Sequence, residues 1–196
     1  MTPENTHDPL ALLDAWIADA ASRGLALPEA MTLATVGEDG RPAARVVLYK
    51  GRSGDGVRFF SNYESRKGRE IARLPYVALV FHWATLERQV RIEGSAELVS
   101  PEESDAYFAT RPRDSQLGAW ASPQSRTIES RAEIEAALEA ARARFDEGKV
   151  TRPPHWGGYR VVPNRVEFWV GRGARIHDRY LFVRAGSSWE RSRLAP

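Results

Sequence analysis

MTLATVGEDGRPAARVVLYKGRSGDGVRFFSN, residues 31–62, decides the fold, because its pattern predicts two β-hairpins in succession. Three segments within it are rich in β-branched and aromatic residues, as strands are: Met31–Val36, Ala43–Lys50 and Val57–Asn62. The two connections, Gly37–Gly40 and Ser53–Gly56, each contain two glycines, which favour tight turns. Since a short turn can join only antiparallel neighbours, the stretch predicts an antiparallel sheet.

Helical patterns surround this sheet. Helices are predicted over residues 8–24, 65–74, 100–110 and 130–146. The first begins with Asp8 as N-cap followed by Pro9, and the last two begin with capping boxes at Ser100 and Ser130. Helices at these places connect strands without the strand–helix–strand rhythm of a parallel sheet.

Further strand-like segments complete the pattern, at residues 76–84, 89–99, 158–170, 180–184 and 189–193. The order of elements predicts an α+β fold, built on a closed antiparallel barrel of six to seven strands with peripheral helices. The interior of a barrel this small is filled by its own side chains. A ligand must therefore bind on the outside of the barrel or at a subunit interface.

Composition limits the class of protein. The chain has 196 residues, of which 42% are hydrophobic, so we expect one folded domain over residues 1–196 with residues 1–7 as a flexible tail. The absence of cysteine excludes disulfides, cysteine-ligated metal sites and thiol nucleophiles. The four histidines give no metal-binding set, and no metal is expected.

Charge and hydropathy limit the partners. The formal net charge is only +2, which argues against a nucleic-acid partner. No apolar run approaches the roughly 20 residues of a membrane span, and the N-terminus lacks a signal-peptide pattern. We therefore expect a cytoplasmic protein without a membrane partner. The basic residues are almost all arginine, which reflects either codon bias or guanidinium forks for phosphate.

Two clusters near the first hairpins could bind anions. Arg45 and Lys50 bracket an apolar strand, although strand ends often carry solvated cations. Ser61, Arg66 and Lys67 lie around the start of the helix predicted from residue 65, where free N–H groups and the helix dipole favour phosphate. An ordinary capped helix start would have the same residues.

Two later clusters are also basic. Tyr107 and Arg111 are spaced i, i+4 on one helical face, Pro112 then breaks the helix, and Ser115 follows just past it; a solvated helix end is the alternative. Further on, three basic residues alternate and would share one face of an extended chain: Arg175, His177 and Arg179. Because three such groups repel one another, they favour an anionic partner. Two candidate phosphate sites without metal or thiol indicate a phosphorylated organic cofactor and a phosphorylated substrate.

The sequence resembles the pyridoxamine 5'-phosphate oxidase family of FMN-binding split barrels from about residue 29 to its end. The matching stretches are RVVLYK (45–50), FFSNYESRK (59–67), LERQV (86–90), YFATRPRDSQLGAWAS (107–122), PQS (123–125), WGGYRV (156–161), VEFWVG (166–171), RIHDR (175–179) and RLAP (193–196). The RPRDSQ-x-GAW and RIHDR pieces are specific to the oxidases within the wider superfamily.

The resemblance implies a homodimer with FMN at its interface and assigns roles by position. Cofactor-binding residues would be Arg45, Val46, Val47, Leu48, Tyr49, Lys50, Phe60, Ser61, Arg66, Lys67 and Gln89, with Gln124, Ser125, Trp169 and Arg179 contributed by the other subunit. The substrate phosphate would be bound by Lys50, Tyr107, Arg111 and Ser115. Arg175 and His177 would lie over the pyridine ring as catalytic residues.

The implied reaction is oxidation of pyridoxamine or pyridoxine 5'-phosphate by O2 to pyridoxal 5'-phosphate and hydrogen peroxide. Hydride would pass from substrate C4' to the flavin, while Arg175 and His177 orient the ring and assist proton removal.

The sequence departs from the family pattern in two ways. Family members usually carry an Arg-Arg-x-Tyr arm ahead of the first helix that closes over the substrate, whereas this chain begins a few residues before its helix. Tyr49 replaces a common leucine. Alternatives are a related flavin oxidase with another substrate, such as a phenazine-biosynthesis-like enzyme, and a non-catalytic flavin- or haem-binding protein.

Overall fold

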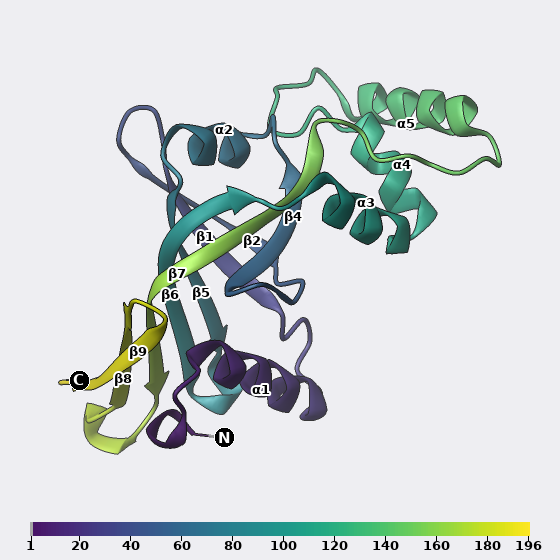
Figure 1. Ribbon diagram of the computed structural model, residues 1–196. Helices are drawn as coiled ribbons and strands as arrows, with labels where there is room; N and C mark the ends of the chain where they lie inside the picture. The colour runs from purple at the N-terminus through teal and green to yellow at the C-terminus, as the bar shows by residue number, and fades with distance from the viewer. Residues whose placement is uncertain (1) are drawn as a thin grey trace.

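The computed structural model describes residues 2–196; Met1, part of the expected tail, lies outside the described residues. Nine strands form one antiparallel sheet (Figure 1): β1 Ala30–Val36, β2 Pro42–Leu48, β3 Arg52–Ser53, β4 Gly56–Asn62, β5 Tyr76–Trp83, β6 Arg88–Leu98, β7 Trp156–Val170, β8 Asp178–Ala185 and β9 Ser188–Leu194. The α-helices are α1 Pro9–Ser22, α2 Arg66–Arg73, α3 Pro101–Thr110, α4 Arg113–Ala121 and α5 Arg131–Phe145. Three 3-10 turns, η1 Pro3–Asn5, η2 Ala84–Leu86 and η3 Gly173–Arg175, complete the chain.

The strand order is β2-β1-β5-β6-β7-β4-β3, with β8 pairing to β7 and β9 pairing to β8. Along one edge, β7 pairs first with β4, up to Val161, and then with β8, from Arg165 onward. Pro163 lies at this change of partner and opposite the irregularity in β6 at Glu93 and Gly94, a position where proline is tolerated in a sheet. The predicted α+β split barrel is confirmed; its main path has seven strands, and the branched β8–β9 hairpin brings the described strands to nine.

The sheet curls until its ends meet. The Lys50 N–H donates to the Arg58 carbonyl at 2.8 Å, and the Arg58 N–H donates to the Gly51 carbonyl at 3.0 Å, which joins the end of β2 to β4. The enclosed core is filled by fully buried side chains from most strands, including Leu33, Phe59, Phe81, Ile92 and Phe168.

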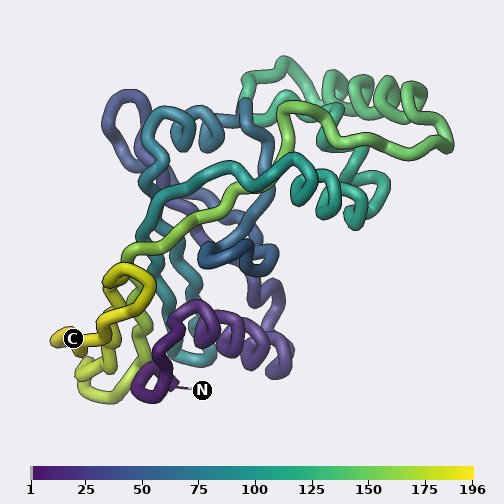
Figure 2. The backbone as a smooth tube through the Cα atoms, in the orientation of Figure 1, coloured from purple at the N-terminus to yellow at the C-terminus, as the bar shows by residue number. Residues whose placement is uncertain are grey.

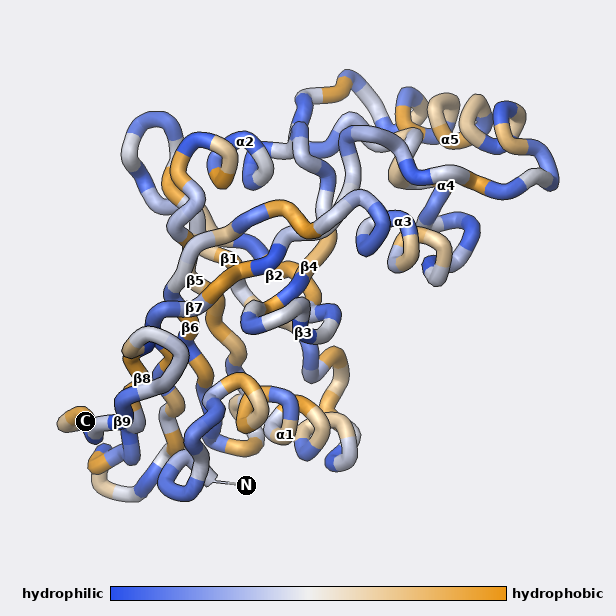
Figure 3. The backbone as a smooth tube through the Cα atoms, in the orientation of Figure 1, coloured by the Kyte–Doolittle hydropathy of each residue, from blue (hydrophilic) through white to orange (hydrophobic). Residues whose placement is uncertain are grey.

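Helix α1 closes one end of the barrel. Asp8 caps it by accepting from the N–H groups of Leu10 and Ala11 at 2.9 and 3.1 Å, as its sequence predicts. Trp16 places its ring edge-on to Phe168, with centroids 5.0 Å apart. Figure 3 shows hydrophobic and hydrophilic residues alternating along this helix, as expected for one buried face.

The segment before α1, expected to be a flexible tail, contacts the β8–β9 hairpin. Tyr180 Oη donates to Glu4 Oε1 at 2.5 Å, and Arg193 pairs with the same carboxylate at 2.6 Å. Pro3 and Thr6 are buried. Both ends of the chain therefore lie at the end of the molecule opposite helices α3–α5 (Figure 2).

Helices α3, α4 and α5 form a second hydrophobic cluster, with Phe108, Leu117, Ala141 and Trp156 buried in it. Helix α4 was not predicted, because Pro112 was interpreted only as the end of α3. Pro112 is also the N-cap of α4, so Ser115 lies in the first turn of a helix rather than in a loop. None of the described helices is long and apolar enough to cross a membrane.

We expect Phe168→Ala to destabilise the protein by about 3–5 kcal/mol, because this ring is fully buried against Trp16 and Phe182. Urea unfolding at fixed protein concentration measures the loss. Phe168→Leu keeps most of the volume and should lose much less; equal losses in the two variants would contradict this packing.

Candidate active site

A cavity of about 450 Å³ lies between β2, β4, α3 and α4. It is lined by Val46, Val47, Leu48, Lys50, Phe60, Ser61, Lys67, Tyr107, Arg111, Pro112, Ser115, Gln124 and Trp156. All of these except Pro112 and Trp156 were assigned to cofactor or substrate from the sequence. The fold therefore brings most of the residues predicted on β2, β4, α2 and α3 to one cavity, outside the filled barrel.

Stacked aromatic rings form one wall of the cavity. Phe60 stacks on Tyr107 with ring centroids 3.8 Å apart and on Trp156 at 5.5 Å. The Arg111 guanidinium lies 4.5 Å from the Trp156 ring centroid, within the range of a cation–π contact. Arg111 follows the last residue of α3 in extended conformation, so the ring of Trp156, rather than the helix, holds it at the cavity.

Arg111 is the least satisfied cation of the cavity. Its Nη1 atom is buried and has no hydrogen-bond partner among the described residues. Burial also lowers the pKa of the guanidinium. An unpaired buried donor is costly, and an anion bound in the cavity would remove that cost.

Lys67 is held by neutral groups. Its Nζ donates to Gln124 Oε1 at 2.8 Å, to Ser61 Oγ at 3.2 Å and to Ser65 Oγ at 3.3 Å. Ser65 also caps α2 by accepting from the Gly68 N–H. Burial lowers the pKa of Lys67, and the nearby charge of Arg45 lowers it further. Gln124 was expected from the other subunit, but here it contacts Lys67 of its own chain.

The charge balance of the cavity favours an anion. Its lining contains three cations, Lys50, Lys67 and Arg111, and no carboxylate. Lys50 has a carboxylate neighbour behind the cavity wall, with Nζ 3.8 Å from Glu29 Oε1. Such a site fits a phosphate or carboxylate group.

Three predicted residues on β2 and α2 lie outside this lining. Arg45 and Arg66 both pair with Glu70, at 2.8 Å each. Tyr49 points into the core, where its hydroxyl donates to Asp14 of α1 and burial raises its pKa. The Tyr49 side chain therefore connects α1 to the end of β2, and its backbone N–H donates to the Glu29 carbonyl at 2.9 Å. Ser125 follows Gln124 with φ of 71°.

The remaining predicted residues form a second group. Gln89, Trp169 and Arg179 lie side by side on β6, β7 and β8. The His177 ring lies 4.6 Å from that of Trp169. Arg179 pairs through Nε with the buried Glu167 at 2.8 Å. This group lies toward the opposite end of β7 from Trp156 (Figure 1).

Residues 173–177 are not extended, so the predicted alternation of Arg175, His177 and Arg179 on one strand face is wrong. Gly173–Arg175 form a 3-10 turn, and Ala174 and Arg175 both have left-handed φ values, 57° and 61°. Left-handed backbone at two successive non-glycine residues costs about 1–3 kcal/mol each and is concentrated at functional sites. The Arg175 side chain is exposed at this turn.

Family models match almost the whole chain. A model described as pyridoxamine 5'-phosphate oxidase matches residues 17–145, and a model of the pyridoxine 5'-phosphate oxidase C-terminal dimerisation region matches residues 156–196. The chain belongs to the pyridoxamine 5'-phosphate oxidase family.

Similar proteins agree with this assignment. The pyridoxine/pyridoxamine 5'-phosphate oxidase of Burkholderia lata is 55% identical over 97% of this chain and 90% of its own, and that of Rubrobacter xylanophilus is 56% identical over 96% and 87%. The crystal structure of PhzG from Burkholderia lata, in complex with tetrahydrophenazine-1-carboxylic acid, superposes with a TM-score of 0.93 at 30% identity, covering 100% of this chain and 98% of PhzG. An FMN-binding protein of Nostoc punctiforme shares the fold, with a TM-score of 0.77 at 21% identity over 97% of this chain and all of its own.

Family membership supports the expected FMN cofactor and homodimer. Within the second group, Trp169, His177 and Arg179 belong to the matched dimerisation region, whereas Gln89 of β6 lies in the region matched by the first model. In a symmetric dimer, an interface residue of each protomer faces the other, so this group can complete the partner's cavity.

Two residues were missed from the sequence, Trp156 in the cavity wall and Glu70, which pairs with Arg45 and Arg66, while Pro112 was predicted only as a helix break. Trp156 lies in a stretch quoted for the resemblance, but a tryptophan before two glycines has no pattern that indicates a cavity wall. Glu70 had a visible signal, because it follows Arg66 by four residues and such pairs meet on a helix surface.

We expect sulfate binding to the cavity to weaken with rising pH at a lower pH than an ordinary lysine would give, because burial lowers the pKa of Lys67. Sulfate keeps its own charge across this range. Isothermal titration at several pH values measures the effect, and Lys67→Met should bind weakly with a flat profile. The same pH dependence in Lys67→Met would contradict the assignment.

Proposed function

We propose that the protein is an FMN-dependent oxidase that converts pyridoxamine or pyridoxine 5'-phosphate, with O2, into pyridoxal 5'-phosphate and hydrogen peroxide. The observation that carries this proposal is the unpartnered buried Nη1 of Arg111 in a cavity that also contains Lys50, Tyr107 and Ser115. These four side chains are the expected set for the substrate phosphate.

The cavity residues fit the flavin as well. The phosphate of FMN would be held by Lys67 and Ser61 of the cavity lining, together with Arg66, which precedes Lys67 at the start of α2, and its ring system would lie along β2. When bound, FMN would take two electrons from the substrate and return them to O2. Trp169 and Arg179 of the second protomer would complete the site, and Gln89, which was not among the residues expected from the other subunit, would come with them because it pairs with Trp169 in the same chain.

The residues of this chain would bind and orient the substrate. Arg111 and Lys50 would neutralise its phosphate, while the Phe60–Tyr107–Trp156 stack would exclude water from that end of the cavity. Each charge-assisted contact is worth about 1.5–3 kcal/mol, so a few give micromolar binding. Arg175 and His177 would orient the pyridine ring.

His177 is better suited to donate a hydrogen bond than to accept a proton. Its Nδ1 accepts from the Arg172 backbone N–H at 3.1 Å, so the neutral ring has its proton on Nε2. Nε2 then donates, and it would bind the hydroxyl oxygen on the pyridine ring of the substrate. The proton released during oxidation would go to another acceptor, such as water.

A second candidate substrate follows from the similarity to PhzG, which binds a phenazine carboxylic acid. A carboxylate could also occupy the cationic cavity. A phosphate has more acceptor oxygens than a carboxylate and uses more of the Lys50, Tyr107, Arg111 and Ser115 set. The larger number of acceptor oxygens therefore favours the phosphorylated substrate. A non-catalytic binder would not need the backbone-strained turn at Arg175.

Addition of pyridoxamine 5'-phosphate to the purified yellow protein under air should give pyridoxal 5'-phosphate and peroxide. Unphosphorylated pyridoxamine should react at least about tenfold more poorly, because it forgoes the charge-assisted contacts of Arg111. A flavin-loaded protein that makes neither product is a binder rather than this oxidase. Equal rates with the two amines would favour the second substrate class.

We expect Arg175→Ala to lower kcat/KM about 10- to 100-fold while FMN stays bound, because Arg175 contacts the substrate ring rather than the cofactor. Steady-state kinetics and the flavin absorbance per protomer measure the two quantities. Arg172→Ala is the matched control, because Arg172 lies three residues away and contacts His177 through its backbone. Loss of FMN in Arg175→Ala would show that this assignment is wrong.

A further inference from the structure

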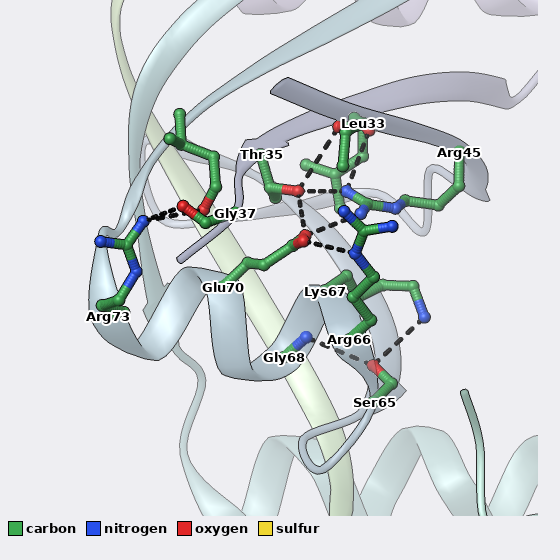
Figure 4. Close-up of polar contacts among 12 residues, drawn as sticks. Leu33, Thr35, Gly37, Arg45, Ser65, Arg66, Lys67, Gly68, Glu70 and Arg73 are labelled. Carbon is green, nitrogen blue, oxygen red and sulfur yellow. Dashed lines mark hydrogen bonds and ion pairs between the residues drawn. The ribbon is translucent and has the colours of Figure 1, made fainter. Parts of the chain in front are cut away.

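Glu70 is a buried carboxylate on α2 that no role assigned above explains. It is 4% exposed and meets Arg45 from β2 at 2.8 Å, through Nη2 and Oε2. Its other oxygen accepts from Arg66 Nε at 2.8 Å, and Thr35 of β1 donates to Oε2 at 2.5 Å. Figure 4 shows the two guanidinium groups converging on this carboxylate from different elements.

This carboxylate stays charged in spite of its burial. Burial would raise the pKa of Glu70, but the hydrogen bonds from Thr35, Arg66 and Arg45 outweigh it and hold the pKa below its ordinary value. A buried charge is tolerated only when it is paired and hydrogen-bonded in this way. The site therefore contains a permanent negative charge beside three cations.

Without Glu70 the cations would repel one another. Arg45 and Lys67 are close enough for the charge of Arg45 to lower the pKa of Lys67, whereas the charge of Glu70 raises it. Arg66 lies one residue before Lys67 and is 62% exposed in its side chain. An exposed arginine with no fixed partner would lose rotamer entropy on binding an anion.

The geometry leaves phosphate-binding atoms available. Glu70 takes only Nε of Arg66, and within residues 2–196 neither terminal nitrogen of Arg66 has an acceptor. The two terminal nitrogens of a guanidinium form the fork that binds phosphate bidentately. Arg45 is fixed more fully, because Nη1 donates both to Thr35 and to the Leu33 carbonyl.

We propose that Glu70 is a positioning residue that, anchored by Arg45, fixes the Arg66 guanidinium for the 5'-phosphate of the flavin. The inference rests on the proposed FMN site. Glu70 itself contacts no ligand; it acts through Arg66 and limits the repulsion between the two arginines. Its effect must therefore depend on the phosphate of the ligand and not on the flavin ring.

The test compares FMN with riboflavin, which has the same ring and ribityl chain but no phosphate. Apoprotein of the full chain is titrated with each flavin, and quenching of flavin fluorescence gives Kd. We expect Glu70→Gln to raise the Kd for FMN at least about tenfold, the equivalent of one charge-assisted contact, and the Kd for riboflavin less than about twofold.

Asp19→Asn is the matched control. Asp19 also pairs with two arginines, Arg23 at 3.1 Å and Arg88 at 2.6 Å, none of which lines the cavity or belongs to the expected site. The Asp19→Asn variant should keep the Kd values for FMN and riboflavin near those of the wild type. If Glu70→Gln does not fold, Thr35→Val removes the hydroxyl that links Glu70 to Arg45 and should give a smaller loss with the same selectivity.

The outcomes separate this inference from the proposed function. A wild-type protein that binds FMN no more tightly than riboflavin has no phosphate site, which overturns both. A wild-type preference for FMN that Glu70→Gln retains, or an equal loss of both flavins in that variant, overturns only the role of Glu70.

Discussion

The change of partner along β7 is the constraint on which the site depends. This single strand of 15 residues pairs with β4 near Trp156 and with β8 near Trp169. At about 3.3 Å per residue, the two tryptophans are roughly 40 Å apart along the strand. A strand fixed by pairing on both edges cannot fold back, so one chain cannot bring the Trp169 group to its own cavity. In the proposed site, a second, antiparallel copy of the chain would therefore have to supply the Trp169 group.

Local signals in the sequence predict much of the fold. Asp8, Ser65 and Ser100 cap helices as their spacing indicates, because a cap needs only neighbouring residues. Long-range facts were not predictable in this way. Pro112 ends one helix and begins the next, and only the packing of α4 against α5 distinguishes a stop from a start. Likewise, the contact of Gln124 with Lys67 depends on a loop that returns to its own α2.

The structure also gives a reason for the high share of arginine among the basic residues. Among the arginines expected at the flavin, Arg45 and Arg66 pair with Glu70, and Arg179 pairs with Glu167, both buried carboxylates. Such pairs keep the net charge near zero while holding each guanidinium in one orientation. Codon bias alone does not require buried acidic partners. The sequence could show the i, i+4 spacing of Arg66 and Glu70, but the contact of Arg45 depends on α2 packing against β1 and β2.

Arg111 differs from these arginines. In the proposed reaction, this difference distinguishes the binding of the substrate phosphate from that of the flavin phosphate. It has an aromatic plane in place of a carboxylate, and its buried Nη1 has no acceptor among residues 2–196. A cation paired with a carboxylate is already held in one orientation before an anion arrives. An unpaired one gains the full charge-assisted bond. The arginines at the flavin end of the cavity are therefore oriented before a ligand binds. At the other end, the buried Nη1 of Arg111 stays desolvated without an acceptor until a phosphate binds. Such an arrangement suits a cofactor that stays and a substrate that exchanges at each turnover.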